Sequence, residues 1–102
     1  MELSKVKTFL EKLKQKDITF DQHFQKRSRE RPIDKSMVGS FLFQLNKLEK
    51  IEQGKQEERF KLWFKMSRKY SLVLIIEIKF SKDLKVISAW NSDRKWQNKL
   101  KQ

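Results

Sequence analysis

Three side chains that can hold or move charge recur at four-residue intervals: His23, Arg27 and Arg31. On an α-helix, successive members of such a series are about 40° apart, so all three share one face. Two arginines one turn apart repel each other unless an anion or a carboxylate relieves them. The spacing therefore predicts a phosphate clamp with a proton-transfer group beside it. The alternative is a solvated face on which the histidine only caps or packs, and a lone histidine favours that alternative.

A second group of basic and aromatic residues lies near the end of the chain and consists of Trp90, Arg94, Lys95 and Trp96, with Tyr70 in a preceding turn. Metal-independent RNA cleavage needs an activated 2′-hydroxyl, cations around the phosphate and a proton for the leaving oxygen. Arg94, Lys95 and Arg27 could supply the charge, and Tyr70 or His23 could exchange the protons. The competing interpretation makes the last tryptophan a packing anchor.

A third group alternates along one segment: Arg59, Lys61, Trp63 and Lys65. Because side chains two residues apart share a face of a strand, cations flank one indole there. Trp63 could stack on a base while its neighbours hold phosphates. Otherwise Trp63 packs beneath the first or the last helix, and the lysines extend past it to water.

Helices must position the first group. Apolar residues at helical spacing predict an amphipathic helix over about residues 3 to 16. A short strand is expected at 17–20. Asp21 offers a cap for the helix of His23, which should end near Arg31 because proline follows. Asp34 offers a cap for a third helix, whose apolar stripe continues to Leu48.

Strands must position the other two groups. The alternation over residues 59–66 predicts a half-buried strand, and the apolar run over 72–80 predicts a central one. A turn over 67–70 would join them, and a last strand is expected at 84–90. The polar segment 49–58 is expected to be a loop. A basic terminal helix would then carry Trp96 and Leu100.

These elements predict one α+β domain over residues 1–102, with a three- or four-stranded, mainly antiparallel sheet packed by helices. The chain of 102 residues suits a single modest core. The first helix, the last helix or a second subunit, as in a homodimer, could cover the second sheet face.

The composition excludes several kinds of catalytic and binding site. The chain has no cysteine, one histidine and two glycines, which excludes disulfides, thiolate catalysis, a histidine-rich metal site and a glycine-rich phosphate loop. We expect no metal and no cofactor. The net charge of +12 favours nucleic acid, an anionic membrane surface or an acidic protein as partner. Lysine-rich composition is also typical of proteins from thermophiles. No apolar run approaches about 18 residues and no signal peptide is visible, so we expect a cytoplasmic protein without membrane spans.

Two segments resemble RelE-like toxins, particularly the BrnT-like branch. ITFDQHFQKRSRERPIDKSMV resembles their opening strand and helices, and KVISAWNSDRKWQNKL resembles their last strand and tail. The likeness covers about residues 17–100 and makes 1–16 an extra helix before a RelE-like core at 17–102. It implies an RNA-cleaving toxin neutralised by an antitoxin. By this likeness His23, Arg27 and Arg31 match the helix positions, and Ser88, Arg94 and Lys95 match the tail. Trp90 departs from the basic residue that often stands there.

The leading hypothesis is that the protein binds RNA. If it also has a catalytic activity, we expect a toxin-type, metal-independent endoribonuclease. His23, Tyr70, Arg94 and Lys95 are the candidate catalytic residues. The candidate binding residues are Arg27, Arg31, Arg59, Lys61, Trp63, Lys65, Trp90 and Trp96. The alternative is a non-enzymatic module of a plasmid or an archaeal virus, active in the host cytoplasm, that binds a peptide at a sheet edge or beside the first helix.

Overall fold

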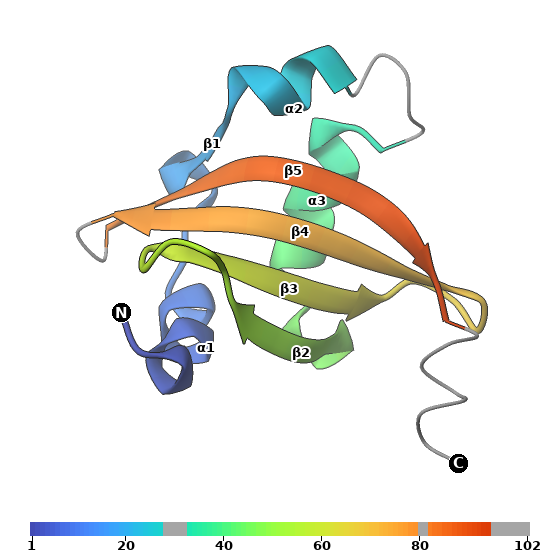
Figure 1. The fold of residues 1–102 in the computed structure, drawn as a ribbon, viewed down its shortest axis with the longest axis horizontal. Helices are drawn as coiled ribbons and strands as arrows, with labels where there is room; N and C mark the ends of the chain where they lie inside the picture. Colours follow the sequence, from blue (N-terminus) through green and yellow to red (C-terminus); the bar gives the residue numbers. More distant parts are fainter. Residues whose placement is uncertain (28–32, 80–81, 95–102) are drawn as a thin grey trace.

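The computed structural model describes residues 1–27, 33–79 and 82–94. Within them the fold is α+β (Figure 1). The elements are α1 (Leu3–Glu11), β1 (Ile18–Phe20), α2 (Gln22–Arg27), α3 (Lys35–Leu42), β2 (Leu48–Gln53), β3 (Arg59–Lys65), β4 (Tyr70–Lys79) and β5 (Asp83–Asp93). Short 3-10 turns lie at Gln15–Asp17 and Leu45–Lys47.

The sheet has five strands in the order β1-β5-β4-β3-β2. β1 runs parallel to β5, while every other neighbouring pair is antiparallel. The prediction of three or four mainly antiparallel strands is therefore wrong in strand number and in the parallel pair. The two helices after β1 carry the chain away from it, and within the described residues β1 pairs with β5, the last strand. A local sequence pattern cannot show such a pairing.

Strand β2 occupies part of the segment predicted to be a loop. The pairing of β2 with β3 shifts register between Leu48 and Lys50, which marks a β-bulge. The bulge puts Leu48 and Ile51 on the same side of the sheet although they are three residues apart. The bulge breaks the alternation of apolar and polar residues that identifies a strand. The sequence pattern of this segment therefore predicted a loop.

Other predicted boundaries also change. Helix α1 ends at Glu11, but Leu13 beyond it is still buried, so the apolar spacing continues without a helix. Tyr70 belongs to β4 instead of the turn, and it pairs with Asp93. β5 extends three residues past Trp90, and the predicted terminal helix lies outside the described residues.

Two predicted helix caps are confirmed. The Asp34 carboxylate accepts a hydrogen bond from the backbone N–H of Met37 at 2.8 Å. The Asp21 carboxylate accepts one from the backbone N–H of His23 at 3.1 Å. Ile33 and Val38, on either side of the Asp34 cap, are both buried in the core. That burial is the arrangement expected of a hydrophobic staple.

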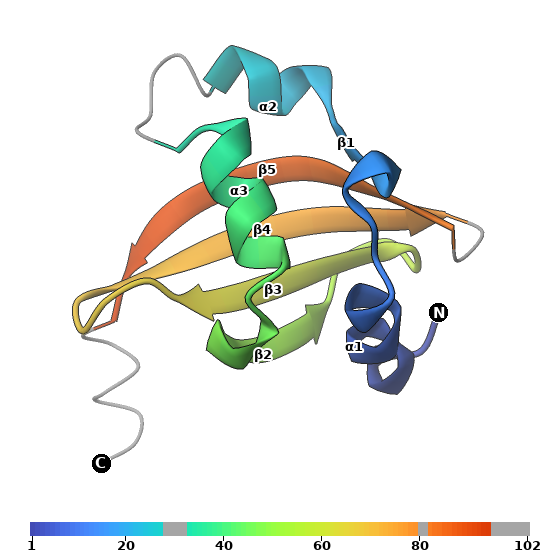
Figure 2. The ribbon, with the colours of Figure 1, turned by 180° about the vertical axis from the view of Figure 1, so that it is seen from behind.

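Helices α1 and α3 cover the same face of the sheet, as Figure 2 shows from behind. One hydrophobic cluster joins them to the strands. Its fully buried strand members include Phe60, Phe64, Leu72, Leu74, Ile76, Leu84 and Val86. Helix α2 lies along β5, where Phe24 packs on Phe20 with ring centroids 5.0 Å apart. Among the residues that the structure describes, none of the helices could reach across a lipid bilayer.

The two glycines should respond to alanine with opposite signs. A Cβ on Gly54 would lie 2.7 Å from the backbone oxygen of Arg59, which accepts the Gly54 N–H at 2.8 Å. The hairpin backbone would have to shift, so Gly54→Ala should lower the free energy of unfolding by about 1–3 kcal/mol. Gly39 lies inside α3 with nothing within 4 Å of its Cβ position. Gly39→Ala should raise the same quantity by about 0.5–1 kcal/mol. Urea unfolding followed by circular dichroism measures both, and equal effects would contradict the hairpin argument.

Candidate functional site

The sheet has a second face that none of the described helices covers (Figure 1). We call it the open face, and it is formed by the strand residues that alternate with the core residues. They are Lys50 and Glu52 of β2, Arg59, Lys61, Trp63 and Lys65 of β3, Ser71, Val73, Ile75, Glu77 and Lys79 of β4, and Lys85, Ser88, Trp90 and Ser92 of β5.

Two tryptophans stand in one row at the middle of the open face. Trp63 pairs with Val73, and Val73 pairs with Trp90, so the indoles come from strands on either side of β4. Val73 is fully buried beneath this row. The Trp63 indole N–H donates a hydrogen bond to the Glu52 carboxylate on β2. This bond fixes the ring of Trp63, whereas Trp90 is half-buried.

The ammonium of Lys61 lies over both indoles. Its Nζ atom is 4.8 Å from the ring centroid of Trp63 and 5.4 Å from that of Trp90. Both distances are within the range of a cation–π interaction. Lys61 lies on β3 one row away from the two tryptophans and pairs with Ile75. A cation and two aromatic rings thus form a single unit at the centre of the open face.

A buried carboxylate lies toward one end of the open face. Glu77 accepts a hydrogen bond from Arg59 Nε at 3.0 Å, and its other oxygen is 3.4 Å from Lys79 Nζ. Burial of the Glu77 carboxylate opposes ionisation, but the hydrogen bonds and charges of Arg59 and Lys79 outweigh it, so its pKa is lowered. Glu77 is therefore ionised at neutral pH and holds its two basic neighbours in place.

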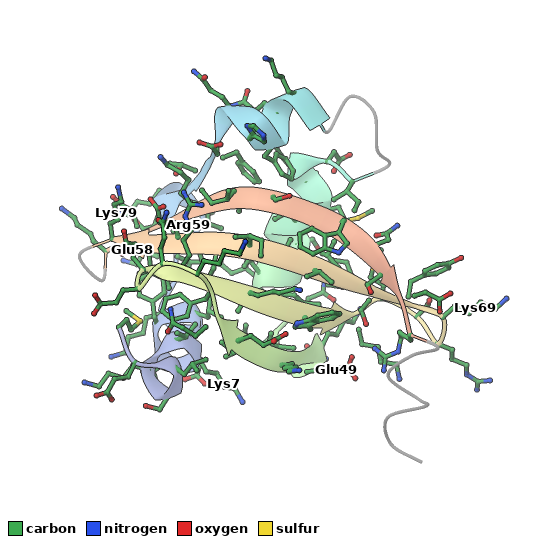
Figure 3. The ribbon with its side chains drawn as sticks, viewed as in Figure 1. Lys7, Glu49, Glu58, Arg59, Lys69 and Lys79 are labelled. Carbon is green, nitrogen blue, oxygen red and sulfur yellow. The ribbon has the colours of Figure 1, made fainter. Side chains whose placement is uncertain are left out.

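A second ion cluster lies toward the other end of the open face. Both Arg94 guanidinium Nη atoms donate to the Glu49 carboxylate, and Nη1 also donates to the Ser71 hydroxyl at 2.9 Å. The hydrogen bond to Glu49 raises the pKa of Arg94, against the opposing effect of burial. Figure 3 shows Glu49 toward the same end of the sheet as Lys69, with Arg59 and Lys79 at the opposite end. The arginine thus ties the end of β5 across β4 to β2.

Basic side chains outnumber acidic ones on the open face. The basic ones are Lys50, Arg59, Lys61, Lys65, Lys79 and Lys85, and the acidic ones are Glu52 and Glu77. Both carboxylates already contact side chains of this face. Lys50, Lys65 and Lys85 are exposed around the central row. The face therefore presents a positive potential with a half-buried indole at its centre.

The structure brings five of the predicted binding residues together on the open face: Arg59, Lys61, Trp63, Lys65 and Trp90. Trp63 lies on the face of the sheet opposite α1, so the first helix does not cover it as the packing interpretation allowed. The predicted C-terminal helix, the other cover in that interpretation, lies outside the described residues. Arg27 ends α2. Arg31 and Trp96 lie outside the described residues, as does Lys95.

The candidate catalytic residues do not share one place. His23 lies on α2, whose Asp21 cap is bonded through its backbone N–H to Val86 of β5. Tyr70 lies beside Asp93, seven residues further along β5, which is roughly 23 Å at the rise of a strand. The guanidinium of Arg94 is engaged by the second ion cluster, as described above. His23 thus stands apart from the other two.

Sequence reasoning missed four contributors to this surface: Glu49, Glu52, Ser71 and Glu77. The sequence contained a signal for the role of Glu77, because a carboxylate inside an apolar strand needs a cationic partner when it is buried. The others depend on pairings between distant strands, such as the 45-residue separation of Glu49 and Arg94. No family model matches this chain, and neither a curated protein nor a solved structure does.

Proposed function

We propose that this protein binds single-stranded RNA across the open face of its sheet. The observation that carries the proposal is the central unit of Lys61, Trp63 and Trp90 within a basic surface. Proteins that bind single strands combine aromatic platforms for bases with cations that follow the backbone. The open face combines both kinds of group on a rigid sheet.

The spacing along β3 suits a polynucleotide. Arg59, Lys61, Trp63 and Lys65 follow at every second residue, so neighbouring members are about 7 Å apart. Cations therefore stand on both sides of the indole along the strand direction. A backbone running parallel to β3 would meet positive charge before and after the aromatic row. The net charge of +12 adds long-range attraction that speeds encounter with a polyanion.

The resemblance to RelE-like toxins is the reason for choosing RNA among polyanions. Cleavage by such a toxin remains a prediction, because His23 and Tyr70 lie at different parts of the described structure. The open face supplies contacts to bases and phosphates. Binding is therefore the function that the geometry supports best.

Fluorescence anisotropy with a labelled 12-nucleotide single strand tests the proposal over a series of KCl concentrations. The logarithm of the affinity should fall linearly with the logarithm of the salt concentration, by about 0.7 for each phosphate neutralised. Trp90→Ala should weaken binding by about 5- to 150-fold, the effect of losing one stacked base. Lys65→Ala should weaken binding and make the salt dependence shallower.

Lys7→Ala is the matched control. Lys7 is an exposed lysine on α1 (Figure 3), and α1 packs on the opposite face of the sheet. Its removal lowers the net charge as much as the loss of Lys65 does, but the affinity should barely change. Equal losses for Lys7→Ala and Lys65→Ala would show that bulk charge, and not the open face, attracts RNA. Tight, salt-insensitive binding of a peptide without RNA affinity would favour the interaction-module alternative, with β2 as the exposed edge strand.

A further inference from the structure

We infer that Trp63 and Trp90 form a slot for one unstacked base, and that Lys61 occupies this slot in the free protein. The inference rests on the proposed function and specifies how its central unit works. The ammonium lies over both rings where the face of a base would otherwise stack. Binding would then be an exchange, in which a base enters and the ammonium moves to a phosphate.

Trp63 lies on the face of the sheet that none of the described helices covers. It is only 6% exposed although it belongs to the open face. Part of its cover is the flexible lysine side chain at 4.8 Å from its ring centroid. A lysine stem with four carbons can rotate away, whereas a helix packed on the ring could not. The part of the cover that Lys61 provides can therefore be displaced.

The walls of the slot are held in place without the lysine. The hydrogen bond to Glu52 fixes Trp63, and the same Glu52 oxygen is 3.7 Å from Lys50 Nζ. Fully buried Val73 separates the two tryptophans at the level of the sheet. Removal of Lys61 should thus open a preformed site instead of collapsing it. Preorganised walls lower the entropy cost of holding a base.

The surroundings decide which occupant replaces the ammonium. Two indoles around a cation could also bind a cationic ligand, but Lys50, Lys65 and Lys85 around the row would repel one. A nucleotide brings a flat aromatic base for the rings and phosphates for the lysines. Bases within a duplex are already stacked, so the slot requires a single strand.

The test compares two ligands: a 12-nucleotide single-stranded RNA and an abasic ribose–phosphate strand of equal length. The second carries the charge but has no base to stack. Lys65→Ala is the matched control for Lys61→Ala, because each variant removes one lysine from the same face of β3. Lys65→Ala should weaken both ligands by a similar factor. Lys61→Ala should weaken binding of the abasic strand as much as Lys65→Ala does, but it should leave the affinity for RNA nearly unchanged. The ratio of the two affinities should therefore favour RNA about 3- to 10-fold more than in the control variant.

Lys61→Arg tests the inference from the opposite direction. A guanidinium stays charged and stacks well on indoles, so it should fill the slot more firmly and lower the preference for RNA below that of the parent. Tryptophan fluorescence of the parent should be quenched by RNA and left almost unchanged by the abasic strand. Unfolding curves of each variant confirm that the fold is retained.

The outcomes separate the two proposals. If the parent binds neither strand, both the proposed function and the slot are wrong. If the parent binds both strands and the preference for RNA is the same in Lys61→Ala as in Lys65→Ala, RNA binding stands and the slot is overturned. Tryptophan fluorescence that does not respond to bound RNA would also overturn the slot.

Discussion

Replacing Glu49 with alanine should lower the free energy of unfolding by about 3 kcal/mol. The variant leaves the Arg94 guanidinium buried, with a side chain only 10% exposed, after its carboxylate partner has gone. Loss of one partner from a buried ion pair costs about 3–5 kcal/mol, since the remaining charge has no water to compensate it. Glu49 is itself about one-third exposed, so we expect the lower end of that range. Urea unfolding followed by circular dichroism measures the loss.

Two further variants identify the cause. Replacing Arg94 by leucine in the Glu49→Ala background should recover much of the loss, because the uncompensated charge disappears. Lys50→Ala removes one partner of an exposed pair, in which Lys50 and Glu52 are 3.7 Å apart and the lysine side chain is 57% exposed. That change should stay within about 0.5 kcal/mol. A Glu49→Ala variant as stable as Lys50→Ala would contradict the buried-charge explanation.

Replacing Phe60 with alanine should lower the free energy of unfolding by about 3–5 kcal/mol. The ring is fully buried in the cluster between the sheet and the helices, so its loss removes apolar burial and leaves a cavity. A domain of this size has only about 5–15 kcal/mol of stability in total. The variant should therefore unfold at a much lower urea concentration than the parent.

Phe43→Ala is the matched control, because the same side chain is lost from a position that is 48% exposed at the end of α3. We expect a change of about 0.5 kcal/mol or less. The comparison tests whether the side chain of Phe60 lies in the core. Similar losses for the two phenylalanines would mean that β3 does not bury Phe60 against the helices as described.

Local patterns in the sequence were enough to predict three of the four strands that carry the candidate site, namely β3, β4 and β5. The alternation around Trp63 predicted β3 and placed Arg59, Lys61 and Lys65 on the same face as the indole. The apolar run from Leu72 predicted β4, and Asp34 predicted the start of α3. These features depend on neighbours within a few residues, so the periodicity of side chains and the geometry of a helix cap reveal them.

Only the tertiary structure decided which strands became neighbours. The bulge in β2 interrupted the alternation that would have identified that strand. The pairing of β1 with β5 brought residues 18–20 beside residues 84–86. The register on both sides of β4 placed Trp90 and Trp63 in one row. The contact of Arg94 with Glu49 has the same origin. Register between distant strands follows from bulges, turn lengths and the packing of the core, which act over the whole chain. The sequence therefore determined which residues share a strand face, whereas the fold determined which of those faces form one surface.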